Sequence, residues 1–187
     1  AKCISCPNGY GTNKTVGNSA CMNKGLYESC SSGFIKNLTT YHCLPCDKGK
    51  YQRGDTCKPC DAGTYGASEG LSECSTCPSG TYSTATGATS NDTCKECPIE
   101  TYNSFPGATV CNACPAGQQC NSVGLKEGIE CEAGTYALKR RSSVCGSCAA
   151  GRYQASKGEA QCDACPPGKF GASSGSITEN DCKMCPA

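Results

Sequence analysis

Residues 74–98 read CSTCPSGTYSTATGATSNDTCKECP, and this stretch holds one complete copy of the pattern on which the chain is built. A C-x-x-C pair is followed directly by Pro78, and Gly80 and Tyr82 stand three and five residues after the second cysteine. A second glycine, Gly87, comes five residues beyond the tyrosine, and the next C-x-x-C pair closes the unit. The stretch therefore predicts a short module delimited by cysteines.

The same module recurs along most of the chain. The C-x-x-C pairs stand at 3/6, 43/46, 57/60, 74/77, 94/97, 111/114, 145/148, 162/165 and 182/185. From 43 onward the steps between pairs are 14, 17, 20 and 17 residues, then a gap of 34, then 17 and 20. Periods in this range indicate a solenoid-like array in which each unit contacts mainly its neighbours.

Cysteine dominates the composition. The chain has 22 cysteines in 187 residues, with three phenylalanines and no tryptophan. Such a content is typical of a disulfide scaffold in an oxidising compartment, because a small apolar core cannot offset the entropy of folding unaided. We expect a small disulfide-rich fold: an elongated, solenoid-like array of about ten short repeats, with sparse β-strands and turns and almost no helix.

Departures from the regular spacing divide the array. We expect irregular modules at 1–42, regular repeats at 43–114, an irregular module at 115–131 and regular repeats again at 132–187.

The spacing also suggests which cysteines pair, although sequence alone does not fix connectivity. In our hypothesis the second cysteine of each pair bonds the first cysteine of the next. The 34-residue gap tests the rule, because Gly128 stands where a cysteine is due and the extra Cys120 takes its role. The rule gives Cys6–Cys21, Cys30–Cys43, Cys46–Cys57, Cys60–Cys74, Cys77–Cys94, Cys97–Cys111, Cys114–Cys120, Cys131–Cys145, Cys148–Cys162 and Cys165–Cys182.

Cys3 and Cys185 are left over, one near each end. Either the chain is a slice of a longer array, or Cys185 of one copy meets Cys3 of the next. The second arrangement is a head-to-tail contact of the kind that generates filaments.

An aromatic residue stands at a fixed place in each regular module. We expect these side chains to pack as small cores against a disulfide or the neighbouring module, with a binding stripe as the alternative reading. They are Tyr51, Tyr65, Tyr82, Tyr102, Tyr136, Tyr153 and Phe170.

Zinc is the main rival explanation of C-x-x-C pairs at this spacing. The missing cysteine at Gly128 would leave a three-cysteine site, and the single histidine, His42, is not placed to complete it. A thioredoxin-like redox role needs a strand–helix context that the sequence lacks. We therefore expect no metal and no cofactor.

The sequence contains few motifs that indicate any other chemistry. No catalytic constellation or phosphate-binding loop is recognisable, so we do not expect an enzyme. The net charge of +1 argues against binding of nucleic acid, and we interpret Lys139-Arg140-Arg141 as solvated surface. No apolar run is long enough to span a membrane. N-x-S/T sequons predict glycosylation at Asn13, Asn37 and Asn91.

The pattern C-x-x-C-P-x-G-x-Y…G…C, clearest at 74–94 and 162–182, resembles ephrin-receptor-like cysteine-rich repeats, which are related to modules of tumour-necrosis-factor receptors. It is also similar to C-x-x-C surface antigens of protists. The chain lacks the six-cysteine grouping of receptor ectodomains and has Glu100 where glycine is expected. The resemblance implies an extracellular array with a role in coats, stalks, adhesion or ligand binding.

From these observations we expect an extracellular or cell-surface structural protein, a glycosylated rod that acts as a coat, stalk or filament subunit. Its partners would be neighbouring repeats or identical subunits joined head-to-tail. The alternative is a ligand-binding ectodomain segment of a receptor or adhesion protein, with an extracellular protein as its ligand.

Overall fold

The computed structural model describes residues 10–12, 21–23, 30–37 and 42–186. In these residues the regular structure consists of short strands and two 3₁₀ turns, without an α-helix. The elements are β1 (Tyr10–Thr12), β2 (Cys21–Asn23), β3 (Phe34–Lys36), β4 (Cys43–Pro45), β5 (Lys50–Arg53), β6 (Thr56–Pro59), β7 (Thr64–Tyr65), β8 (Ser75–Thr76), β9 (Thr81–Tyr82), η2 (Asn91–Thr93), β10 (Lys95–Glu96), β11 (Thr101–Tyr102), β12 (Asn112–Ala113), β13 (Gln118–Gln119), β14 (Ile129–Glu130), β15 (Thr135–Tyr136), β16 (Gly146–Ser147), β17 (Arg152–Tyr153), β18 (Asp163–Ala164), β19 (Lys169–Phe170), η3 (Glu179–Asp181) and β20 (Lys183–Met184). The prediction of a disulfide-rich repeat array with sparse strands and almost no helix is confirmed.

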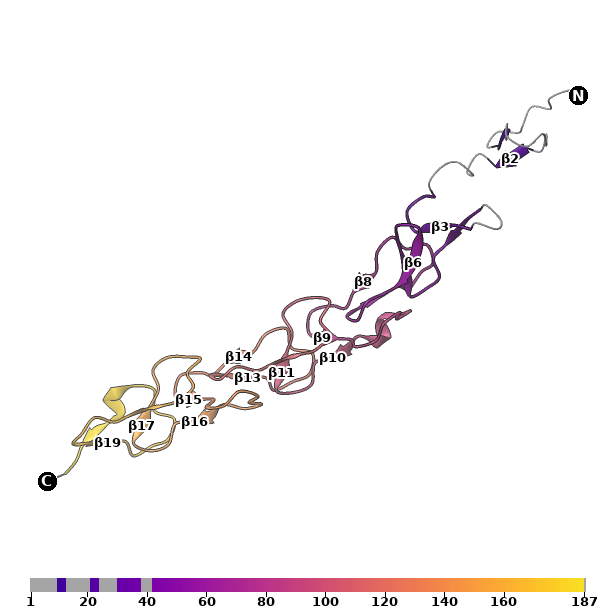
Figure 1. Cartoon of the computed structure of the whole chain (residues 1–187). Coiled ribbons are helices and arrows are strands. Elements are labelled where there is room, and N and C mark those ends of the chain that lie inside the picture. The colour runs from indigo at the N-terminus through magenta and orange to yellow at the C-terminus, as the bar shows by residue number, and fades with distance from the viewer. Residues whose placement is uncertain (1–9, 13–20, 24–29, 38–41, 187) are drawn as a thin grey trace, which may run out of the picture. The chain divides into compact units, whose positions relative to one another are not determined.

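Each strand pairs with a neighbour along the chain, so the described residues form ten separate two-stranded antiparallel sheets (Figure 1). In the regular modules the first strand carries the aromatic residue of the repeat, and the second strand is the x-x segment of the following C-x-x-C pair. In one such pair, Thr101 lies opposite Ala113 and Tyr102 opposite Asn112. Every regular module is therefore a hairpin whose far end already belongs to the next cysteine pair.

A tight turn opens each hairpin. We name a module by the second cysteine of its C-x-x-C pair and count positions from that cysteine. In the Cys77 module, the N–H of Thr81 at +4 donates to the carbonyl of Pro78 at +1, at 3.2 Å. The third residue of this turn, Gly80, has a φ of +83°, which glycine adopts without steric cost. The glycine three residues after the cysteine is thus a turn residue.

The core consists of cystine. The described residues contain nine disulfides, at Cys30–Cys43, Cys46–Cys57, Cys60–Cys74, Cys77–Cys94, Cys97–Cys111, Cys114–Cys120, Cys131–Cys145, Cys148–Cys162 and Cys165–Cys182. These are the pairs that the neighbour rule gives for the described residues; Cys6–Cys21 involves a cysteine outside them. The fully buried side chains are almost all cysteines, including Cys77 and Cys131 at 0% exposure.

The aromatic side chains lie outside this cystine core. Tyr51, Tyr65, Tyr82, Tyr102, Tyr136 and Tyr153 are half-buried, and Phe170 is 40% exposed. The ring of Tyr136 lies over its cross-strand neighbour Gly146, where an added Cβ would be 3.7 Å from the ring. This tyrosine therefore covers its own hairpin, and the interior next to the disulfide is filled by another position.

The chain forms two compact units. One contains residues 1–75 and 85–93, and the other contains residues 76–84 and 94–187. The division passes through the Cys77 module.

Within each unit a fixed set of backbone hydrogen bonds links consecutive modules. We call the contact between two consecutive modules a joint. Between the Cys131 and Cys148 modules, Gly134 N donates to Gln154 O at 2.8 Å and Ala137 N donates to Glu159 O at 3.3 Å. In return, Gly158 N donates to Cys131 O at 2.8 Å. The same three positions, +3, +6 and +10, donate in the joint between the Cys114 and Cys131 modules. Buried backbone groups of these loops are thereby satisfied without a large sheet.

The two glycines of the repeat also meet between modules two apart. A Cβ on Gly117, at +3 of the Cys114 module, would overlap the carbonyl oxygen of Gly158, at +10 of the Cys148 module. The same overlap arises for the pairs Gly33/Gly70, Gly49/Gly87, Gly80/Gly124 and Gly134/Gly175. The glycine at +3 is required both by its turn and by this close approach.

Two alanine substitutions separate these two requirements. Gly117 and Gly151 share a positive φ, at +82° and +80°, but a Cβ on Gly151 meets no atom within 4 Å. We expect Gly151→Ala to cost about 1–2 kcal/mol, the conformational cost alone. Gly117→Ala should cost a further 1–3 kcal/mol or so, because the added methyl group has no room. Guanidinium titration of the oxidised variants measures both; equal losses would show that the close approach contributes nothing.

Candidate functional site

The joint between modules is built around the side chain at +6. A Cβ on Gly66 would lie 3.2 Å from Cys60 Sγ, and one on Gly171 would lie 3.5 Å from Cys165 Sγ, so this position points at the disulfide of its own module. Other modules place Ser83, Asn103, Cys120, Ala137 and Gln154 there, each at most 6% exposed. The period of the sequence does not mark +6 as special, because its residue type changes from module to module.

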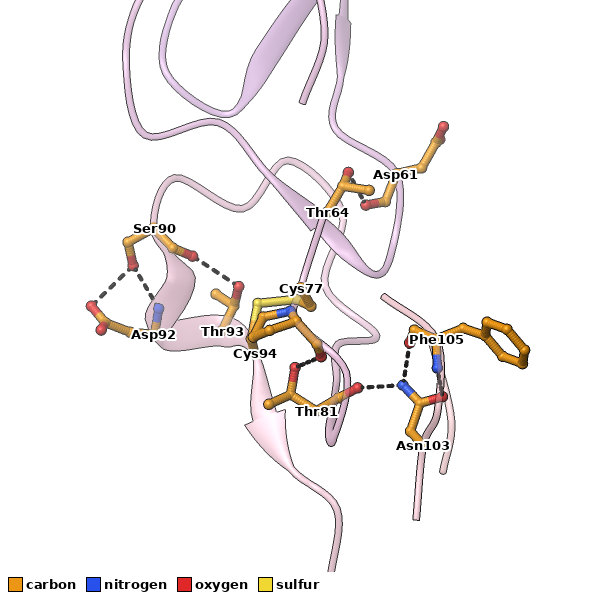
Figure 2. Close-up of a disulfide and its surroundings, with 11 residues drawn as sticks. Asp61, Thr64, Cys77, Thr81, Ser90, Asp92, Thr93, Cys94, Asn103 and Phe105 are labelled. Atoms are coloured by element: carbon orange, nitrogen blue, oxygen red, sulfur yellow. Dashed lines mark hydrogen bonds between the residues drawn. A yellow bond between two sulfur atoms is a disulfide. The ribbon is translucent and has the colours of Figure 1, made fainter. Parts of the chain in front are cut away.

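Asn103 shows how a polar residue at +6 links two modules (Figure 2). Its Nδ2 donates to the carbonyl of Thr81 at 2.9 Å, in the Cys77 module, and to the carbonyl of Phe105 at 2.8 Å. Its Oδ1 accepts a longer bond from Phe105 N at 3.4 Å. The buried amide therefore fixes the loop that contains Phe105. The ring of Phe105 points away from the Cys77–Cys94 disulfide and is 74% exposed.

Cys120 occupies the same inward position, which explains its pairing. The register of β13 and β14, with Gln118 opposite Glu130 and Gln119 opposite Ile129, continues to place Cys120 opposite Gly128. Gly128 is the site of the missing cysteine. Because +6 points at the second cysteine of its own module, a cysteine there bonds Cys114 without leaving the module.

The remaining predicted residues do not gather at one place. Asn91 is exposed and begins η2, whose hydroxyl and carboxylate bonds join Ser90, Asp92 and Thr93 (Figure 2). Asn37 is half-buried, and its N–H donates to His42 O at 2.9 Å. Asn13, Cys3 and Cys6 lie outside the described residues. Cys185 is exposed and outside any disulfide of the described residues.

Charged groups are sparsely paired. The part of the chain that the structure describes has three ion pairs, Lys50–Asp47, Lys157–Glu132 and Lys169–Glu179, all substantially exposed. The hydrogen bond to Glu132 raises the pKa of Lys157 above its usual value. Among the same described residues there is no group of His, Cys, Asp or Glu side chains arranged to hold a metal ion, and no helix with the length and apolar character to cross a bilayer.

Two surface hollows lie at equivalent joints. One of about 440 Å³ is formed by Tyr102 and Ser104 together with residues of the Cys114 module that include Gln118 and Glu127. The other, of about 260 Å³, is formed by Tyr136 and Leu138 together with residues of the Cys148 module that include Arg152 and Gln161. Both use +5 and +7 of one module and +1, +4 and +13 of the next. The joint thus offers a recurring place for a ligand side chain, with walls that differ between modules.

Removing the Asn103 amide should loosen this joint. We expect Asn103→Ala to cost about 1–3 kcal/mol, because two backbone carbonyls lose a donor in a buried setting. Faster amide hydrogen exchange in the Phe105 loop should accompany the loss. The Asn103→Asp variant retains the acceptor oxygen but loses both donated bonds, so it should not restore the protection of these amides from exchange. Protection equal to wild type in the alanine variant would contradict the role given to Asn103.

The irregular disulfide should be convertible into a regular one. In the double variant Cys120→Ala/Gly128→Cys we expect Cys114 to bond the new thiol at position 128, because that position has the place of the first cysteine in every regular module. Peptide mapping of the unreduced protein identifies the bond. Free thiols at both positions would show that Gly128 is needed for another reason, such as the space beside Gln118 Oε1, which a Cβ at this position would overlap.

Comparison with known proteins agrees with this architecture. The family model for tyrosine-protein kinase ephrin type A/B receptor-like repeats matches residues 53–94 and 134–182. No curated protein matches the chain. The matched segments contain four of the disulfides described above, Cys60–Cys74, Cys77–Cys94, Cys148–Cys162 and Cys165–Cys182, with their turn glycines. The chain is therefore built of cysteine-rich repeats, and its segments 53–94 and 134–182 are similar to ephrin-receptor-like repeats.

Proposed function

We propose that the chain is an extracellular structural segment, a glycosylated and disulfide-stapled spacer that acts in a surface coat, stalk or filament. The observation that carries the proposal is the uniform joint. Consecutive modules are linked by the same backbone hydrogen bonds, and each module is closed by its own disulfide. Bonds of this kind depend little on side-chain identity, as suits a spacer.

The nine disulfides and the repeat family favour an extracellular setting, where such bonds persist. The three predicted sequons would add sugars to the surface of the spacer, and the exposed residue Asn91 is the most accessible of those the structure describes. We propose no catalytic role, because repeats of this type are structural or ligand-binding modules.

A ligand-binding ectodomain segment is the second candidate function. It is favoured by the receptor-like family model and by the exposed side chains of Phe105 and Val110, 74% and 69% exposed, which lie within one module. Exposed apolar side chains are typical of contact surfaces where they form a contiguous patch.

Denaturing electrophoresis with thiol alkylation, run with and without reductant, tests the filament form of the proposal. If Cys185 joins subunits through Cys3, the unreduced protein should give a ladder of multiples that reductant collapses to one band. The variant Cys185→Ser should remove the ladder, whereas Asn91→Gln should leave it unchanged.

A single unreduced band with an alkylated Cys185 would exclude the covalent filament and leave a spacer within a longer array. Extensive alkylation of the other cysteines without reductant would overturn the disulfide scaffold itself, and with it the structural proposal.

A further inference from the structure

The hollow between the Cys131 and Cys148 modules differs from its counterpart in the character of its walls. At +7 it has Leu138 where the other hollow has Ser104, and at +4 it has Arg152 where the other has Gln118. Both hollows are formed by the same positions of the repeat, so the fold determines where they lie. The chemistry of each hollow is a property of these individual residues.

The hollow is lined by the apolar side chain of Leu138 and by the positively charged guanidinium of Arg152. Leu138 is 60% exposed although it borders a concave surface beside the half-buried ring of Tyr136. The Nη1 of Arg152 donates to the carbonyl of Cys162 at 2.8 Å, which holds the guanidinium at the hollow. An anchored arginine next to an apolar surface is a combination that protein interfaces favour.

Basic side chains are frequent along the segment that supplies Tyr136, Leu138 and Arg152 to this hollow. Residues 133–158 contain five basic side chains and no acidic one, in a chain whose net charge is only +1. Lys157 is paired with Glu132, and Glu130, Glu159 and Asp163 lie just outside the stretch. Arg152 and the basic loop, which consists of Lys139, Arg140 and Arg141, are exposed and take part in none of the three ion pairs of the described residues.

The basic loop is held in place. Arg141 N donates to Cys114 O at 2.8 Å, and the hydroxyl of Ser142, directly after the loop, donates to Lys139 O at 2.8 Å. Ala137, just before the loop, is buried and bonded to the next module. A fixed loop loses little conformational freedom when a partner binds, so its charges are available at low entropic cost.

We propose that this surface, Tyr136, Leu138 and Arg152 with the basic loop 139–141, is a docking site for an acidic polypeptide segment that carries an apolar anchor residue. The anchor lies in the hollow against Leu138 and Tyr136, and carboxylates of the segment pair with Arg152 and the basic loop. Charge complementarity selects an acidic partner. The apolar wall favours a polypeptide over a sulfated polysaccharide, which has no apolar side chain to place against Leu138.

Fluorescence anisotropy with labelled synthetic peptides tests the proposal on the whole oxidised chain. The probes are a short peptide of Asp and Glu with a central Leu-Phe, the same peptide with Ser-Ser in the centre, and a heparin oligosaccharide. We expect the apolar-anchored peptide to bind about tenfold more tightly than the Ser-Ser peptide, because its anchor removes apolar surface from water in the hollow. Binding should weaken as salt is raised.

Variants borrowed from the equivalent hollow provide matched controls. Leu138→Ser should abolish the preference for the apolar anchor, and Arg152→Gln should weaken binding of both acidic peptides. Ser104→Leu, at the polar hollow, should change neither. Hydrogen exchange of each variant checks that the joint remains folded.

Three outcomes would overturn the proposal. In one, Leu138→Ser leaves the affinity for the anchored peptide unchanged. In another, the two peptides bind equally while the heparin oligosaccharide binds more tightly, which would identify a polyanion site. In the third, neither peptide binds at low salt.

Discussion

The rest of the structure depends on the two cysteines of each C-x-x-C pair standing three positions apart in the sequence. The segment that holds the pair is extended, with its two middle residues in a strand, as in β10 or β18. Side chains alternate between the faces of an extended chain, so cysteines an odd number of residues apart point to opposite sides. One sulfur therefore closes the preceding module and the other closes the following one, as Cys94 and Cys97 do with Cys77 and Cys111. This alternation makes the chain an array instead of a set of independent knots.

The disulfides close the loops, but the backbone aligns them. The joints within a unit use N–H groups at +3, +6 and +10, and none of these bonds needs a particular side chain. The surface hollows are formed by side chains at +1, +4, +5, +7 and +13, and most of these differ between the two joints. The backbone bonds that align the modules and the side chains that line the hollows thus stand at different positions of the same short repeat, so one scaffold carries an acidic-walled hollow at Glu127 and a basic one at Arg152.

The period, the repeat type and the scarcity of helix can be predicted from the sequence because cysteine, glycine and tyrosine recur at fixed offsets. The side chains that pack beside the cystines cannot be predicted in this way. They stand at +6, where the residue type varies among serine, asparagine, cysteine, alanine and glutamine. The sequence pattern predicts module cores made of tyrosine, whereas the tyrosines are half-buried because cystine already fills the interior. The hollows are equally hidden in the sequence, because each draws its walls from two modules whose register is visible only in the fold.

The two non-glycine residues with positive φ in the described part of the chain show how a departure at one position is tied to another. Glu100 has a φ of +72° at +3 of the Cys97 module, and Arg141 has a φ of +63° at +10 of the Cys131 module. Elsewhere these positions, in modules two apart, are the glycines that approach each other, such as Gly117 and Gly158. Both residues keep the hydrogen bonds of the glycines they replace, to Cys120 O and Cys114 O. The left-handed backbone is therefore retained at both positions while the requirement for glycine has been given up at both. Arg141 is also part of the basic loop that follows Leu138, so one departure of the repeat from its pattern supplies charge to the proposed docking surface.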